Sequence, residues 1–161
     1  EHLAEEYSDW GGSMVTISPN NDLAFIEVNS GANWSIIDPD IFANADGEEM
    51  VWDIKAKEII KRFPLKDASP RTSEFTPDGR YVLVRTRPAT IVYDTESIEE
   101  VTKIEIENSG HPAFSPDSSF AYIPNPGDSS VDVFEVGSFK KVDSLKLPYS
   151  PSKIIPINTN N

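Results

Sequence analysis

The chain has 161 residues, of which 38% are hydrophobic and 25% are charged, so it is long enough for one domain with a modest core. Its formal net charge of −13 at pH 7 argues against nucleic acid and anionic membranes as partners, because both are bound through clustered Lys and Arg side chains. It has no cysteine, which excludes disulfides, zinc–thiolate sites and thiol nucleophiles.

Residues 1–12 form an N-terminal segment with no predicted strand. The opening EHLAEEYSDW lacks the basic and apolar regions of a secretion signal. No apolar run approaches the roughly 18 residues that a membrane helix requires, so we expect no membrane insertion. Because the sequence opens with glutamate, we expect a processed product or a fragment. An extracytoplasmic location is compatible with this expectation.

A first repeat unit is expected at about residues 13–65, with the strands SMVTIS, DLAFIEV, EMVWDI and EIIKRFPL. Relative to the later units it carries about 16 additional residues at one hairpin, within SGANWSIIDPDIFANADG. A loop that grows on a rigid scaffold often serves binding, although a surface elaboration without function costs folding equally little.

Two shorter units follow. In the second unit, about 71–107, we predict strands at 71–76, 81–86, 89–95 and 101–107. The third unit, about 111–147, has the strands HPAFS, FAYIPN, SVDVFEV and KVDSLKL. Short connections such as PDG and GSF predict antiparallel hairpins. A closing strand at 151–157, which overlaps SKIIPIN, is expected to be the first strand of a fourth unit.

Two markers recur in the units. In TPDG, Pro77 fixes φ, Asp78 bonds the nearby backbone and Gly79 accepts positive φ, which predicts a tight hairpin turn. Asp53, Asp94 and Glu135 follow one another at intervals of 41 residues, and we expect them to bond the backbone of their turns. Self-similarity at about 40 residues, with four short strands per unit, predicts an all-β fold of β-propeller blades.

The number of units predicts a partial propeller over residues 13–161, because a ring needs at least about four blades to hide its edge strands. Three arrangements are open. Other polypeptide completes the ring, copies associate to complete it, or the long loop caps an open arc. We favour the first, with this chain as the C-terminal part of a larger propeller.

The units resemble the YVTN family of β-propeller repeats, over residues 13 to about 157. TPDGRYVLV with TIVYDTES, and SPDSSFAYIPN with VDVFEVGS, carry this resemblance. It implies a fold and leaves function open. GGSMVTISPNNDLAFIEVNSG, VWDIKAKEII and the ending YSPSKIIPINT are similar to late blades of the d-type-haem propeller in cytochrome nitrite reductases. That family's haem-contacting histidines lie on earlier blades, so no haem ligand is carried over.

His111 is the candidate cofactor-binding residue, because it opens the first strand of the third unit and would face a propeller channel. The alternative is a histidine that bonds a loop or is solvated. Arg85 and Arg87 lie two residues apart in RTRP, so we expect them on one face, where they could bind a carboxylate, a haem propionate or an acidic partner. Internal ion pairs are the alternative use.

The insertion holds two further candidate sites. Asp38, Asp40 and Asp46 could ligate calcium, although their spacing does not fit the helix–loop–helix pattern and a solvated acidic loop is the alternative. Trp34 and Phe42 would suit a partner surface, or would pack the loop back onto its own blade.

Three functions follow from these observations. The leading hypothesis is a binding or scaffolding module whose partner is a protein or the remaining blades, because the sequence shows no catalytic constellation. The second is part of a haem-dependent periplasmic oxidoreductase, which rests on the resemblance alone. The third is a cell-surface repeat protein that assembles with the help of cations.

Overall fold

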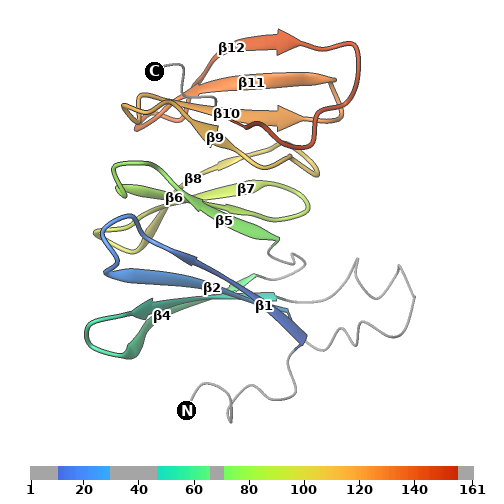
Figure 1. Ribbon diagram of the computed structural model, residues 1–161. Coiled ribbons are helices and arrows are strands. Elements are labelled where there is room, and N and C mark those ends of the chain that lie inside the picture. Colours follow the sequence, from blue (N-terminus) through green and yellow to red (C-terminus); the bar gives the residue numbers. More distant parts are fainter. Residues whose placement is uncertain (1–10, 30–46, 66–70, 156–161) are drawn as a thin grey trace. The chain divides into compact units, whose positions relative to one another are not determined.

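The structure is a computed structural model that describes residues 11–29, 47–65 and 71–155. Within these residues, twelve β-strands form three four-stranded antiparallel sheets, and there is no helix (Figure 1). This confirms the predicted all-β fold class. The chain divides into two compact units, Glu1–Arg71 and Thr72–Asn161. The first unit contains one of the sheets and the second contains two.

Each sheet is one blade, and its strands are neighbours in chain order. Blade 1 consists of β1 (Gly11–Ile17), β2 (Leu23–Asn29), β3 (Gly47–Asp53) and β4 (Glu58–Leu65). Blade 2 consists of β5 (Thr72–Phe75), β6 (Tyr81–Arg85), β7 (Thr90–Asp94) and β8 (Glu99–Ile104). Blade 3 consists of β9 (Ala113–Phe114), β10 (Phe120–Asn125), β11 (Ser130–Glu135) and β12 (Lys141–Lys146).

Most of these bounds agree with the sequence prediction within one or two residues. Two strands differ more. β8 begins and ends earlier than the predicted 101–107, because Ile98 closes the preceding turn with a φ of 54°. β9 has two residues where five were predicted, because Pro112 has no N–H and the N–H of His111 donates to Ser152 outside the sheet.

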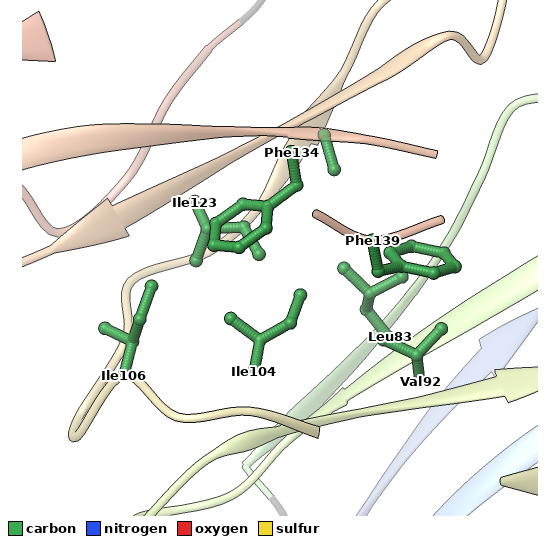
Figure 2. Close-up of a cluster of buried hydrophobic side chains, with 8 residues drawn as sticks. Leu83, Val92, Ile104, Ile106, Ile123, Phe134 and Phe139 are labelled. Atoms are coloured by element: carbon green, nitrogen blue, oxygen red, sulfur yellow. The ribbon is translucent and has the colours of Figure 1, made fainter. Parts of the chain in front are cut away.

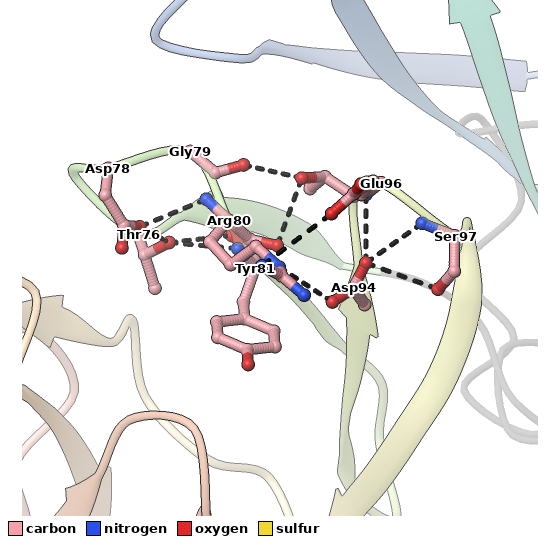
Figure 3. A network of polar contacts seen from close by, with 9 residues as sticks. Thr76, Asp78, Gly79, Arg80, Tyr81, Asp94, Glu96 and Ser97 are labelled. Carbon is pink, nitrogen blue, oxygen red and sulfur yellow. Dashed lines mark hydrogen bonds and ion pairs between the residues drawn. The ribbon is translucent and has the colours of Figure 1, made fainter.

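The turn between the first and second strands has the same structure in all three blades. In blade 2 the Thr76 hydroxyl donates to Asp78 Oδ1 at 2.6 Å and accepts the Tyr81 N–H at 3.0 Å (Figure 3). Asp78 Oδ1 also accepts the Arg80 N–H at 3.0 Å, and Gly79 has a φ of 73°. The equivalent residues are Ser18, Asn20 and Asn21 in blade 1, and Ser115, Asp117 and Ser118 in blade 3. The predicted turn is confirmed.

The turn between the third and fourth strands also repeats. Asp94 Oδ1 accepts the N–H groups of Glu96 and Ser97 at 3.0 and 2.9 Å, and Oδ2 accepts Arg80 Nε–H at 2.8 Å (Figure 3). Burial alone would raise the pKa of Asp94, but the hydrogen bonds from Ser97, Arg80 and Glu96 outweigh it and lower the pKa. The turn closes at a residue with positive φ, which is Lys57 in blade 1, Ile98 in blade 2 and Phe139 in blade 3.

The recurring acid bonds its turn in two ways. Asp53 Oδ1 accepts the Ala56 N–H at 2.7 Å, and Asp94 accepts backbone N–H groups likewise, which confirms the prediction for these two. Glu135 instead accepts the hydroxyl of Ser138 at 2.6 Å, in line with its longer side chain. Each blade also has a bulge in its fourth strand, where one extra residue lies opposite the step that follows Val51, Val92 or Val133 on the third strand.

Blades 2 and 3 share a hydrophobic core. Leu83 and Val92 of blade 2 are fully buried and belong to one cluster with Ile123 and Phe134 of blade 3 (Figure 2). Its other buried members are Ile104, Ile106, Ala121 and Phe139. Burial of each such large side chain contributes about 1.5–3 kcal/mol, so this interface is a main source of stability in the second unit. The fourth strands β8 and β12 are mostly exposed, as predicted for outer strands.

Candidate interaction face

Each blade has two faces, and the strand register identifies equivalent residues on them. In blade 2, Tyr81, Leu83 and Val92 contact blade 3, and we call this side the forward face. Leu83 lies opposite Val92, and in blade 3 Tyr122 lies opposite Val133 in the same register. Side chains alternate between the two sides of a strand. The forward face of blade 3 therefore carries Phe120, Tyr122, Pro124, Val131 and Val133.

The two forward faces differ in burial. On the forward face of blade 2, Leu83 and Val92 are 0% exposed and Tyr81 is half-buried. Their equivalents in blade 3 are less covered, because Tyr122 and Val133 are half-buried and Phe120 is 38% exposed. On β12, Leu145 lies opposite Val131 and is 62% exposed. Large apolar side chains gathered on one side of a sheet indicate an interaction surface. The forward face of blade 3 is our candidate site.

The chain crosses the two forward faces at equivalent points. After blade 2, the carbonyl of Ser109 accepts Arg85 Nε–H and Nη2–H at 3.1 and 2.5 Å. The register equivalent of Arg85 is Pro124. Arg85 follows Leu83 by two residues, and Pro124 follows Tyr122, the equivalent of Leu83, by two residues. A Cβ at Gly110 would collide with the Ser152 carbonyl oxygen and lie 2.5 Å from Pro124 Cβ. Ser152 therefore passes blade 3 where Ser109 passes blade 2.

His111 lies just before β9 at the border of blades 2 and 3. Its Nδ1 is 3.4 Å from Glu74 Oε1, and the two side chains are 38% and 37% exposed. Its backbone forms an isolated parallel bridge with Lys153. The structure thus places His111 in a contact between blades, and its role in binding a cofactor stays a prediction.

The two arginines of RTRP do not share a face, contrary to the expectation from their spacing. Arg85 is 6% exposed, and besides Ser109 it bonds the Thr72 hydroxyl through Nη1–H at 2.8 Å. The Thr86 N–H then donates to the Ala89 carbonyl, which closes a turn and leaves Arg87 exposed. The bonds of Arg85 favour an internal use, and a partner role for Arg87 stays a prediction.

The candidate residues of the insertion, Trp34, Asp38, Asp40, Phe42 and Asp46, lie outside the described residues. Their predicted roles in cation and partner binding stay predictions. In the part of the chain that the structure describes, no three His, Asp or Glu side chains come together as a group that could hold a metal ion. That same part contains no helix long and apolar enough to cross a membrane.

Sequence reasoning missed a buried carboxylate in blade 3. Asp132 is 2% exposed, forms an ion pair with Lys141 at 2.8 Å and accepts the Ser144 hydroxyl at 2.7 Å. Asn125 and Ser130 donate to it at 3.1 Å each. Burial alone would raise the pKa of Asp132, but these donors outweigh it and lower the pKa to about 2. The alternation in SVDVFEV could have indicated that Asp132 is buried, since Asp132 lies on the same side of β11 as the core residue Phe134.

Two buried glutamates in blade 1 were also missed. Glu27 and Glu49 lie directly opposite each other on β2 and β3, and they are 2% and 0% exposed. Like charges in opposite positions destabilise a sheet, and both side chains have interaction partners. The predicted strands DLAFIEV and EMVWDI contain these two acids, but the sequence did not indicate that both are buried.

Several solved structures are similar to this chain. Hydrazine synthase of Kuenenia stuttgartiensis is similar with a TM-score of 0.60 and 23% identity, over 86% of this chain and 36% of that chain. The WD40 repeats of RRP9 are similar with a TM-score of 0.63 and 13% identity, over 84% of this chain and 38% of theirs. A Bacteroides uniformis protein with a provisional assignment as a 6-phosphogluconolactonase is similar with a TM-score of 0.62 and 17% identity, over 91% of this chain and 44% of that chain.

These similarities show a β-propeller fold, and this chain spans less than half the length of each of the three structures. No protein-family model matches the chain, and no curated protein matches its sequence. Because each identity is 23% or lower, the similarities identify the fold alone. The chain consists of propeller blades.

Proposed function

We propose that this chain is the C-terminal part of a larger β-propeller and works as a binding or scaffolding module. The exposed forward face of blade 3 is the observation that carries the proposal. Leu83 and Val92 of blade 2 are fully buried against the next blade, whereas their register equivalents in blade 3, Tyr122 and Val133, are only half-buried, and Phe120 beside them is 38% exposed. An apolar face with this pattern is suited to a further blade.

The first unit supports the same proposal independently. Val15 and Ile17 of β1 are 56% and 54% exposed, and they lie opposite Ile26 and Ala24 on one side of blade 1. The equivalent of Ile17 in blade 3 is Phe114, because each pairs with an alanine at the start of the second strand. Phe114 packs against the core shared with blade 2. Blade 1 thus offers a second apolar side at a place where a neighbouring blade would bind.

Native mass spectrometry of the protein from its natural source tests this function. Paired with the mass under denaturing conditions, it shows whether more polypeptide than this 17.9 kDa chain is present. We expect a heavier native particle that contains further blades, either in the same polypeptide or in a bound one. A single 17.9 kDa chain in the native spectrum contradicts the proposal.

A charge on the forward face provides the matched control. Phe120→Asp places a carboxylate where the further blade would pack, so it should weaken a noncovalent particle or lower the Tm of a longer polypeptide. Val142→Asp changes a residue that is 54% exposed on the outer strand β12, and it should leave the particle intact. Equal effects of the two variants would count against the forward face as the contact.

A further inference from the structure

The segment 151–155 already occupies a strand position beside blade 3. The His111 N–H donates to the Ser152 carbonyl at 2.9 Å, and His111 and Lys153 form a parallel bridge. In the chain, this segment follows β12, as β9 follows β8. It therefore holds the position that the first strand of a fourth blade would take.

Gly110 makes this position possible. A Cβ at residue 110 would collide with the Ser152 carbonyl and approach Pro124 Cβ to 2.5 Å, so any side chain here would displace the segment. The Gly110 N–H donates to the Pro124 carbonyl at 3.0 Å, which fixes the glycine against β10. The segment is thus held by a backbone bond on one side and by close contact on the other.

We infer that the forward face of blade 3 receives a three-stranded sheet that lacks its own first strand, which residues 151–155 supply. The inference rests on the proposed function and names the partner more closely. A complete four-stranded blade would bring a first strand into a position that Ser152 and Lys153 already fill. A sheet with an open edge strand instead gains backbone hydrogen bonds from the segment.

The established contact between blades 2 and 3 indicates the chemistry of this partner. There the forward residues Tyr81 and Leu83 meet Ala121, Ile123 and Phe134, which are small, branched or aromatic. The forward face of blade 3 offers Phe120 and Val133 at the register positions of Tyr81 and Val92, and it offers Tyr122 at the position of Leu83. The expected partner is therefore an antiparallel sheet with a small residue and branched aliphatic residues on its contacting side.

The position of the segment is tested first, in the full chain, by hydrogen exchange of the His111 amide. We expect this amide to be protected, and we expect Gly110→Ala to remove its protection while the amides of β6 and β10 stay protected. Gly127→Ala is the matched control, because a Cβ there would meet only Asn125 Oδ1 at 3.6 Å. An unprotected His111 amide in the unchanged chain overturns the inference.

The partner is tested with blade 2 as the probe. The full chain is extended at its end by a copy of residues 81–104, which contain β6, β7 and β8 but no first strand. Six residues, 156–161, then join the segment to the added strands, against five between β5 and β6. If the added strands cover the forward face, Phe120→Asp should lower the Tm of the extended chain by at least about 4 °C more than that of the original chain.

A second extension separates the inference from the proposed function. A copy of residues 72–104 adds a complete blade with its own first strand. If this version buries Phe120 and releases the His111 amide, the face accepts a whole blade and the inference is overturned, while the proposed function stands. If Phe120→Asp lowers the Tm equally in the original and both extended chains, the face receives no blade and the inference is also overturned.

Discussion

The forward faces of blades 2 and 3 have the same backbone register but opposite surroundings. Leu83 and Val92 are 0% exposed in the shared core, whereas their equivalents Tyr122 and Val133 are half-buried. The turns that fix the strands are the same in both blades, so local sequence determines the blade and its neighbour determines the burial. In a repeat protein, burial of such a face depends on contact with the neighbouring repeat.

Truncation of the two faces should separate them most strongly. Leu83→Ala leaves a cavity in the core, so we expect the free energy of unfolding to fall by about 2–5 kcal/mol. Tyr122→Ala on the forward face of blade 3 should cost about 1 kcal/mol or less in the chain alone, because its side chain is only partly buried. Urea denaturation measures both values. Similar losses would show that the two faces are equally covered.

Acid should act on blade 3 more than on blade 2, because Asp132 stands where blade 2 has Ile91. The folded-state pKa of Asp132 is about 2, below its usual 3.8, so its contribution is complete above pH 3.8 and is lost as the pH falls toward 2. Between about pH 5 and pH 2, the chain should lose roughly 2 kcal/mol more stability than Asp132→Asn. Parallel pH profiles would contradict this assignment.

The recurring turns should respond alike, whatever surrounds their blade. Thr76→Val removes the hydroxyl that bonds Asp78 and the Tyr81 N–H, and Ser115→Ala removes its equivalent in blade 3. Each change should cost about 1 kcal/mol in chemical denaturation. If only the blade 2 change had an effect, the turn of blade 3 would not depend on its hydroxyl.

The smallest effect on stability is expected at the forward face itself. Phe120→Ser should change the free energy of unfolding of the chain alone by at most about 0.5 kcal/mol, because this side chain is 38% exposed. The same variant should bind less of a dye that reports exposed apolar surface. An unchanged dye signal would mean that Phe120 contributes little to that surface.

Much of the fold could be predicted because the determinants of a blade are local. A proline, a small polar residue and a positive-φ position specify the turn at Pro77, and the short apolar run YVLV specifies the next strand. The candidate face could not be predicted in this way. Phe120 and Tyr122 follow the alternation of a buried strand, and only the structure shows that Phe120 is exposed and Tyr122 is half-buried.

The candidate residues show the same limit. The spacing of Arg85 and Arg87 indicated one face, but Arg85 ends β6 and Arg87 lies in the turn that follows. Burial of Asp132 depends on donors up to 12 residues away along the chain, such as Ser144. Contacts of this kind are set by pairing between strands, which composition and spacing do not specify.

The bulged residues Ile60, Val101 and Val142 recur every 41 residues, which is also the interval of Asp53, Asp94 and Glu135. Backbone irregularity and sequence therefore share one period. Duplication of a gene segment of that length would add a blade with both turns and the bulge already in register. A shorter insertion is placed between two paired strands in this chain, since residues 30–46 lie between β2 and β3. A lineage that carries such blades can lengthen by whole units and diversify at one hairpin without refolding the rest.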